Sequence, residues 1–183
     1  MTPGCASWTV LRALLLVPWL AALCAADWKT RRLPNALTLG GLAVGLAVDL
    51  GWGGVDGLLS GLEAAGVSAL FLLPPFLVRA AGAGDLKMLA ACGAFIGMGE
   101  VLPFLLFVSF AGFFVAVAMV VARRTGAARL KHAFRTLFDW RYDRKAGRAA
   151  LPPKEDEAGR VPFGLAIAMG TLATLVVEAC RGC

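Results

Sequence analysis

Six stretches of mainly apolar residues limit the folds open to this chain more than any other feature of its sequence. A helix needs roughly 20 such residues to cross the hydrocarbon layer of a membrane, and each stretch comes near that length. The shorter stretches are rich in Gly and Ala, which allows neighbouring helices to pack closely. The pattern predicts an all-α membrane protein, a bundle of about six transmembrane helices. The predicted helices cover residues 8–26, 36–51, 57–78, 86–101, 103–122 and 162–180.

The composition agrees with lipid as the main solvent of the chain. Of its 183 residues, 59% are hydrophobic and only 16% are charged, and the mean hydropathy is +0.75. A soluble domain of this size carries more charge. The net charge of +6 would point to nucleic acid in a soluble protein, but here the basic residues lie between the apolar stretches. We expect no nucleic-acid partner and a single integral membrane domain over residues 1–183.

The first apolar stretch has some features of a cleavable signal peptide, because small residues precede Asp27. However, residues 1–10 contain no Lys or Arg, and Arg12 lies within the apolar stretch rather than before it. Secretory signals carry their positive charge ahead of the apolar segment. We therefore expect residues 8–26 to remain as the first helix.

The basic residues predict the orientation of the bundle. Sixteen of the eighteen Lys and Arg residues fall near 27–35, 79–87 and 123–161, which six spans would place on one side of the membrane. Segments rich in Lys and Arg stay in the cytoplasm, so we expect this side to face the cytoplasm and an anionic leaflet. The long basic loop at about 123–161 contains either an amphipathic helix on the membrane surface or a simple basic tether.

Two aspartates stand where lipid meets cytosol. Asp27 ends the first predicted helix and Asp85 opens the fourth, so both are expected at the same depth on the cytoplasmic side. Two carboxylates within reach of one another cannot both ionise cheaply, so one retains a proton and the pair acts as acid and base. In aspartyl proteolysis the ionised Asp removes a proton from water while the other polarises the scissile carbonyl. Which of the two is the base does not follow from the sequence.

Simpler explanations of these aspartates remain open at this point. An Asp at a helix start is favoured as a cap and by the helix dipole, and Asp27 would mark the end of a span or pair with nearby bases. Gly82 and Gly84 precede Asp85 and have no Cβ. Their turn can therefore adopt unusual dihedrals, and the backbone of a substrate or partner can come close.

No metal or organic cofactor is expected. The cytoplasmic side has no cluster of His or Cys residues, and hydrolysis by two carboxylates needs only water. Cys180 and Cys183 form one C-x-x-C, but a single pair without further ligands is a weak indication of a metal site.

Three segments resemble motifs of the type IV prepilin peptidase family. DWKTRRLPN (Asp27 to Asn35) is similar to the first aspartate motif, in which basic residues and a Pro-Asn follow the aspartate. GAGDLKMLAACGAFIG, which begins at Gly82, is similar to the second motif, a G-x-G-D-x-K before a helix of small residues. VPFGLAIAMG (Val161 to Gly170) is similar to the segment that starts the last helix. The three occur in the family's order and extend over most of the chain.

This resemblance implies an aspartic endopeptidase of the bacterial inner membrane, which removes the basic leader of prepilins or pseudopilins at the cytoplasmic face. It implies that Asp27 and Asp85 are the catalytic pair. Lys87 would pair with an acid, orient its helix or extend to the membrane surface, and Pro34 would start a helix. The matching positions with supporting roles are Gly82, Gly84, Lys87, Arg31, Pro34, Asn35, Pro162 and Gly164.

Large members of that family carry an N-terminal domain with paired cysteine motifs and also methylate the new N-terminus. No such motif precedes Asp27 here, so we expect the short, peptidase-only form. The alternatives are a G-x-G-D protease that acts on other membrane helices, and a non-catalytic scaffold or small transporter. A transporter would bury charge near the bilayer midplane, where the predicted spans have none, and a scaffold would tolerate Asp-to-Asn changes. The sequence indicates neither the particular substrate nor the oligomeric state.

Overall fold

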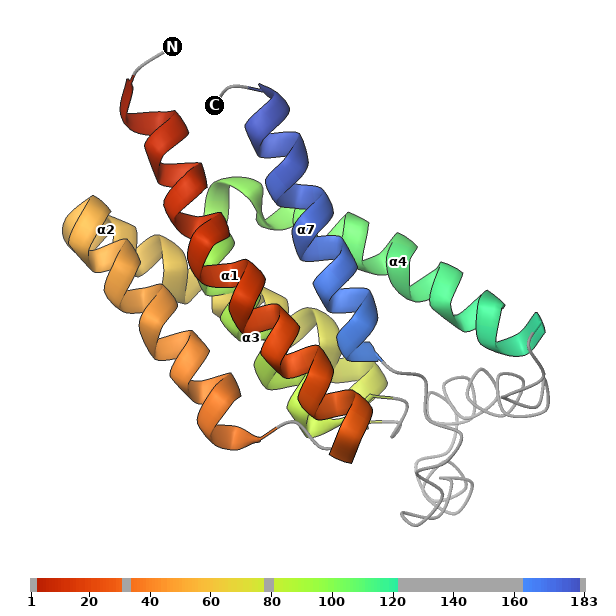
Figure 1. Cartoon of the computed structure of the whole chain (residues 1–183). Helices are drawn as coiled ribbons and strands as arrows, with labels where there is room; N and C mark the ends of the chain where they lie inside the picture. Colours follow the sequence, from red (N-terminus) through yellow and green to blue (C-terminus); the bar gives the residue numbers. More distant parts are fainter. Residues whose placement is uncertain (1–2, 31–33, 78–80, 122–162, 182–183) are drawn as a thin grey trace.

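A computed structural model describes residues 3–30, 34–77, 81–121 and 163–181, and this part of the chain is helical. The predicted basic loop at 123–161 lies outside the described residues, as do Arg31 and Pro162. No strand occurs in the described part, so the predicted all-α class is confirmed. Its elements are α1 (Pro3–Thr30), α2 (Asn35–Leu77), α3 (Ala83–Ile96), a 3₁₀ turn (Met98–Glu100), α4 (Val101–Val121) and α7 (Phe163–Arg181) (Figure 1).

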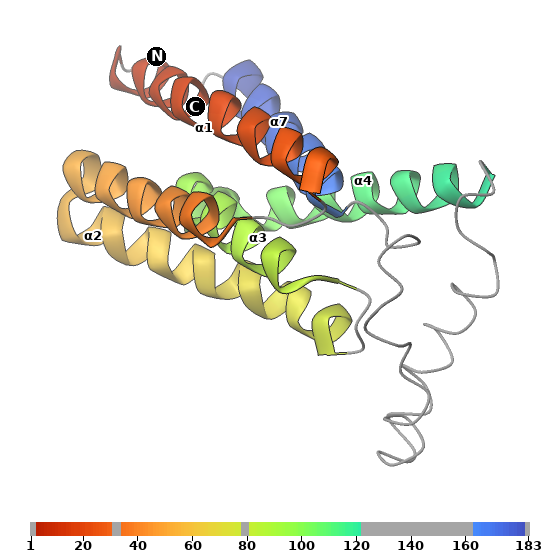
Figure 2. The same ribbon diagram turned by 60° about the horizontal axis from the view of Figure 1, so that its bottom comes forward.

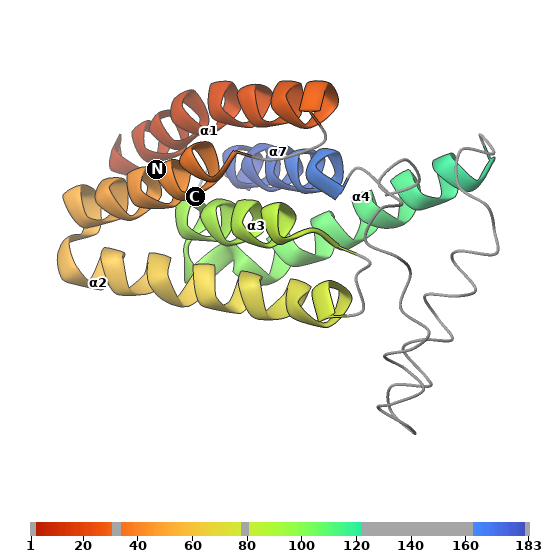
Figure 3. The ribbon, with the colours of Figure 1, turned by 90° about the horizontal axis from the view of Figure 1, so that it is seen from below.

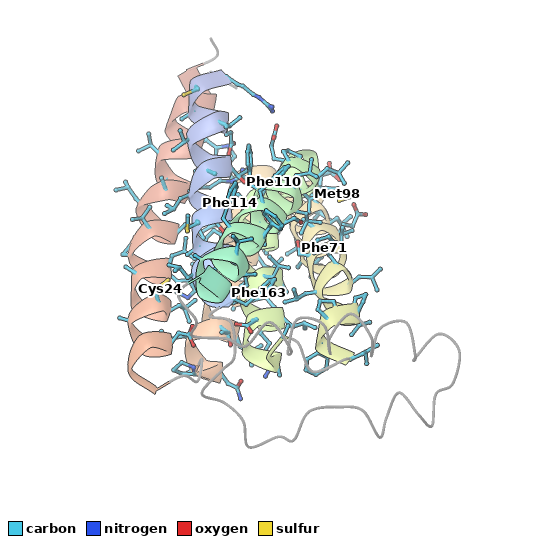
Figure 4. The ribbon with its side chains drawn as sticks, turned by 90° about the vertical axis from the view of Figure 1, so that its right-hand side faces the viewer. Cys24, Phe71, Met98, Phe110, Phe114 and Phe163 are labelled. Carbon is cyan, nitrogen blue, oxygen red and sulfur yellow. The ribbon has the colours of Figure 1, made fainter. Side chains whose placement is uncertain are left out.

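The described helices have the length and surface of a multi-pass membrane protein. Four of them, α1, α2, α4 and α7, contain segments that are long and apolar enough to cross a membrane. Large apolar side chains lie exposed along their outer faces, among them Phe71 on α2 and Phe110 and Phe114 on α4 (Figure 4). Such a surface is unsuited to water and suited to lipid.

Helix α2 consists of two helical halves that fold back on each other. Gly54 separates them with φ 62° and ψ −146°. Glycine adopts such a positive φ readily because it has no Cβ, whereas other residues rarely do. Figure 3 shows the two halves of α2 running side by side. A Cβ on Gly57 would collide with the backbone oxygen of Asp49, so glycine permits this close approach. The two halves correspond to the predicted helices at 36–51 and 57–78.

Helix α3 is shorter than the sequence predicted. It has 14 residues, or about 21 Å of length, which is less than the hydrocarbon thickness. Gly97 ends the helix with φ 77°, and its N–H donates to the Gly93 oxygen at 2.9 Å. Helix α4 then begins at Val101. Since the residues from Met88 to Ile96 are nearly all buried, α3 is surrounded by protein and need not span the bilayer itself.

The helices form two units that pack against each other. Helix α3 packs mainly on α2, where Gly93 lies directly against Ser68, and we call this pair the α2–α3 unit. Helix α1 packs mainly on α7, and this pair is the α1–α7 unit. Figure 2 shows the α1–α7 unit lying on one side of the α2–α3 unit. Helix α4 packs on α7, where Gly170 meets the backbone of Val108.

One end of the bundle gathers four helix termini that carry predicted site residues. Helix α1 ends there, and α2, α3 and α7 begin there, whereas α1 begins and α7 ends at the opposite end (Figure 1). Asp27, Asn35, Asp85 and Gly164 are therefore all at the first end, which we call the site end.

Replacing Gly170 with Ala should lower the free energy of unfolding by about 1–3 kcal/mol because it overpacks the α4–α7 contact. The added Cβ would lie 2.6 Å from the backbone nitrogen of Val108, which only a backbone shift can relieve. Thermal unfolding in detergent measures the effect. Gly66→Ala in α2 is the matched control, because nothing lies within 4 Å of its Cβ position and Ala is favoured over Gly in a helix by about 1 kcal/mol. Equal melting temperatures for the two variants would contradict the close packing of α4 on α7.

Candidate active site

Asp27 lies in the last turn of α1, where it meets the start of α7. Its side chain is half-buried. A Cβ built on Gly164, the second residue of α7, would lie 3.2 Å from Oδ2 of Asp27. The missing side chain at position 164 thus allows the carboxylate to lie against the α7 backbone. The third predicted motif therefore contacts the aspartate of the first.

Asp85 lies in the first turn of α3 and closes that turn. Its Oδ2 accepts a hydrogen bond from the Gly82 N–H at 2.9 Å, and a carboxylate at this position also interacts favourably with the helix dipole. The side chain is half-buried. Asp85 is therefore not the N-cap, which is Gly82, but the third residue of the helix, and its carboxylate bonds back to the N–H of that cap.

Gly82 and Gly84 do not adopt the unusual dihedrals that glycine makes possible. Gly82 has φ −86° and ψ 156°, which any residue adopts, and Gly84 is an ordinary helical residue of α3. Among the described glycines only Gly54 and Gly97 have positive φ, and neither is at the site end.

Gly164 also connects α7 to the helix that carries Asp85. A Cβ on Gly164 would lie 3.7 Å from Sδ of Met88. Met88 is fully buried and follows Asp85 by three residues, which places both on neighbouring positions of one face of α3. Asp27 and the Met88 side chain therefore both border Gly164. The helix termini that carry the two aspartates come together at the start of α7.

Lys87 links the first and second predicted motifs. Its Nζ donates to Oδ1 of Asn35 at 2.8 Å, across 52 residues of sequence. Asn35 is the first residue of α2, and Pro34 directly precedes the helix and caps it, because its oxygen accepts from the N–H groups of Leu37 and Thr38 at 3.1 Å. Of the roles considered for Lys87, the contact with Asn35 favours orientation of a helix, since it ties the start of α3 to the start of α2.

Trp19 is a residue of this region that sequence reasoning missed. Its indole N–H donates to the Leu37 oxygen at 2.9 Å, and its ring packs near that of Phe95 with centroids 6.1 Å apart. Gly41 leaves the space that the Trp19 ring fills. Trp19 thus joins α1 to the α2–α3 unit two turns before Asp27. A tryptophan within an apolar stretch gives no sign of such a contact, because Gly41 is distant in sequence.

The described residues include no group of three or more His, Cys, Asp or Glu side chains that would hold a metal ion. Cys24 of α1 lies one turn before Asp27 and is half-buried (Figure 4). Two carboxylates at the meeting point of three helices, with small residues around them, are suited to acid–base chemistry on a substrate that comes close to the backbone.

The type IV leader peptidase family has a model that matches residues 14–117. This range is more than half of the chain and contains Asp27 and Asp85. The chain belongs to the type IV leader peptidase family. The third predicted motif, at Val161 to Gly170, lies outside the matched range.

Curated relatives of this leader peptidase family member come from several bacteria. The chain is 37% identical over 124 residues to the prepilin leader peptidase/N-methyltransferase of Neisseria gonorrhoeae, which covers 64% of the chain and 43% of the relative. It is 31% identical over 138 residues to that of Aeromonas hydrophila, with 67% and 43% covered. It is 40% identical over 104 residues to that of Burkholderia pseudomallei, with 53% and 33% covered. The chain spans less than half the length of these relatives, and no solved structure matches it.

The contact between Lys87 and Asn35 can be measured by a double-mutant cycle. Lys87→Met and Asn35→Leu should each lower the free energy of unfolding by about 0.5–1 kcal/mol, as for a hydrogen bond near the surface. The double variant should lose no more than either single variant, because both changes remove the same bond. Denaturation in detergent measures all four proteins.

Glu63→Gln, at an exposed position of α2, supplies the control for this cycle. Its effect should add to that of Lys87→Met, since the two sites share no partner. Additive losses for Lys87→Met and Asn35→Leu would show that the two side chains do not interact.

Proposed function

We propose that this chain is a membrane-embedded aspartic endopeptidase that removes the basic leader peptide of prepilins or pseudopilins. The observation that carries the proposal is the meeting of three helix termini at the site end, where Asp27 borders Gly164 and Met88 of the Asp85 helix borders the same glycine. Membership of the type IV leader peptidase family supports it, as do relatives named prepilin leader peptidase.

In the proposed reaction Asp27 and Asp85 act together on one peptide bond. The ionised carboxylate takes a proton from a water molecule, which attacks the scissile carbonyl, and the protonated carboxyl donates a hydrogen bond to the carbonyl oxygen. The proton that leaves water is passed on to the departing amine. Because the two groups interact, they titrate as a pair. The reaction needs no metal ion or organic cofactor.

The proposed location follows from charge and from the substrate. Most of the Lys and Arg residues lie in the segments that directly precede, along the sequence, the helices that begin at the site end. This favours a bacterial inner-membrane protein whose site end faces the cytoplasm and an anionic leaflet. A prepilin combines an apolar helix with a basic leader, so its helix would lie in the bilayer while the leader stays in the cytoplasm. The bond to be cut would then lie at the depth of the two aspartates.

Asp27→Asn and Asp85→Asn, made separately, should each lower kcat for leader removal by about 10²–10⁴-fold, because an amide neither accepts the proton of water nor shares one. Each purified variant is incubated with a full-length prepilin in detergent, and the cleaved product is followed by gel shift. Asp56→Asn is the matched control, because Asp56 is exposed near the α2 turn at the opposite end of the bundle. It should cut at the native rate.

Near-native cleavage by either of the first two variants would refute the catalytic pair. It would favour the simpler explanations of the aspartates, in which Asp85 stabilises the start of α3 and Asp27 marks the end of a span, because a change from Asp to Asn then has little consequence.

Gly164→Ala should reduce kcat about tenfold, and Gly164→Val should reduce it further, since displacement of a catalytic group by a fraction of an ångström is costly. The Ala Cβ would lie 3.2 Å from the Asp27 carboxylate and push it away from α7. Gly112→Ala is the control, because its Cβ would meet the Phe163 ring at an ordinary 3.6 Å. Native kcat for Gly164→Val would contradict the placement of Asp27 against α7.

A further inference from the structure

A buried group of charged side chains lies at the end of the bundle opposite the two aspartates. Arg12 of α1 and Asp49 of α2 are 8% and 5% exposed. Arg12 Nη2 is 3.9 Å from Asp49 Oδ1, and Arg12 Nη1 is 3.4 Å from Glu178 Oε1 on α7. Arg12 Nη1 also donates to the Ile96 oxygen, at the end of α3, at 3.2 Å. We call Arg12, Asp49 and Glu178 the Arg12 cluster.

The packing around the Arg12 cluster is adapted to it. Gly61 lies directly against Oδ2 of Asp49, so any side chain there would displace the carboxylate. Oδ2 of Asp49 and Oε2 of Glu178 accept no hydrogen bond within the described residues. Burial of ions costs several kcal/mol each, and apolar replacements of such groups are often neutral or stabilising. Stability alone therefore gives little reason for these charges, and ionisable groups inside a membrane are functional candidates.

The Arg12 cluster joins the two units of the bundle. Arg12 and Glu178 belong to the α1–α7 unit, whereas Asp49 and Ile96 belong to the α2–α3 unit. At the site end the aspartates are divided in the same way, because Asp27 is on α1 and Asp85 is on α3 (Figure 2). The separation of the two aspartates therefore depends on how one unit lies on the other.

One face of α1 connects the Arg12 cluster to the site end. Residues separated by three or four positions share a helix face, and this spacing runs through Arg12, Leu16, Trp19, Leu23 and Asp27. Leu16 and Leu23 are fully buried. Arg12 and Asp27 are 15 positions apart, or about 22 Å along the helix. Helix α1 is continuous from Arg12 to Asp27, with one backbone hydrogen bond missing at Pro18, so a small tilt of α1 at the Arg12 end moves Asp27.

We propose that Arg12 is a positioning residue. Through Asp49, Glu178 and the Ile96 carbonyl it fixes the α1–α7 unit on the α2–α3 unit. It thereby sets the separation of Asp27 from Asp85. The inference rests on the proposed function for its effect on catalysis. Its structural part, the separation of the site-end helix termini, can be measured without any activity.

The test uses spin labels at the site end. Ala25 on α1 and Ala83 on α3 are exposed, and each is replaced by Cys in a chain whose five native cysteines are replaced by Ser. Pulsed EPR in detergent gives the distance distribution between the labels. Arg12→Met should lengthen or broaden this distribution, and in the unlabelled chain it should lower kcat about a hundredfold, as for a misplaced catalytic group.

Two variants complete this test. Arg181→Met breaks an exposed ion pair with Glu100 at the same end of the bundle and should leave both the distance and kcat unchanged. Arg12→Lys retains the charge and should restore part of kcat. A native distance distribution in folded Arg12→Met overturns the proposal. If Arg12→Met changes the distance between the labels but Asp27→Asn still cuts the prepilin, the catalytic pair is refuted and the positioning role of Arg12 stands.

A third variant covers the case in which Arg12→Met fails to fold because two buried carboxylates are left without a cation. Arg12→Met combined with Asp49→Asn and Glu178→Gln removes the uncompensated charge together with the ionic contacts. A lengthened distance in this variant supports positioning by the Arg12 cluster. A native distance in it shows that the units find their arrangement without the Arg12 cluster, which overturns the proposal.

Discussion

The close approach of α7 to α1 and α3 at Gly164 is the contact on which the candidate active site depends. Asp27 lies against this glycine from α1, and Met88 lies against it from the helix of Asp85. A side chain at position 164 would hold the helices apart, and the separation of two carboxylates decides whether they share a proton. Gly170 and Gly93 permit similar approaches elsewhere in the bundle. Since lipid gives apolar helices no hydrophobic reason to associate, contacts of this kind supply much of the attraction between them.

Lipid also explains the position of α3 within the bundle. Backbone groups in a membrane have to be paired internally, and charged groups need protein or water around them. Helix α3 has only 14 residues, but protein covers it from Met88 to Ile96. Its first turn, with Asp85, lies at the site end, where Lys87 contacts Asn35. A short internal helix can therefore present a carboxylate at one end of the bundle without exposing it to the hydrocarbon.

Much of this arrangement could be predicted from the sequence, and the failures have physical reasons. Apolar stretches predicted the helices, and the matched depth of Asp27 and Asp85 predicted that both would lie at one end. The length of α3 was overestimated because hydropathy does not register the positive φ of Gly97. The contacts of Trp19 with Leu37 and of Arg12 with three other helices depend on how the helices pack. No periodicity within one segment reveals such contacts between segments.

The two aspartates belong to different units, so their separation is a property of the contact between units and of no single helix. Packing at small residues sets how closely two helices approach. Polar contacts fix a register, since a guanidinium and a carboxylate interact well only in a narrow range of geometries. Trp19 and Arg12 supply such contacts along the face of α1 that ends at Asp27. The cost of burying Arg12, Asp49 and Glu178 is therefore understandable as the cost of fixing geometry at the other end of the bundle. Under the proposed function, a displacement of the two aspartates would change the rate of the reaction far more than it changes stability.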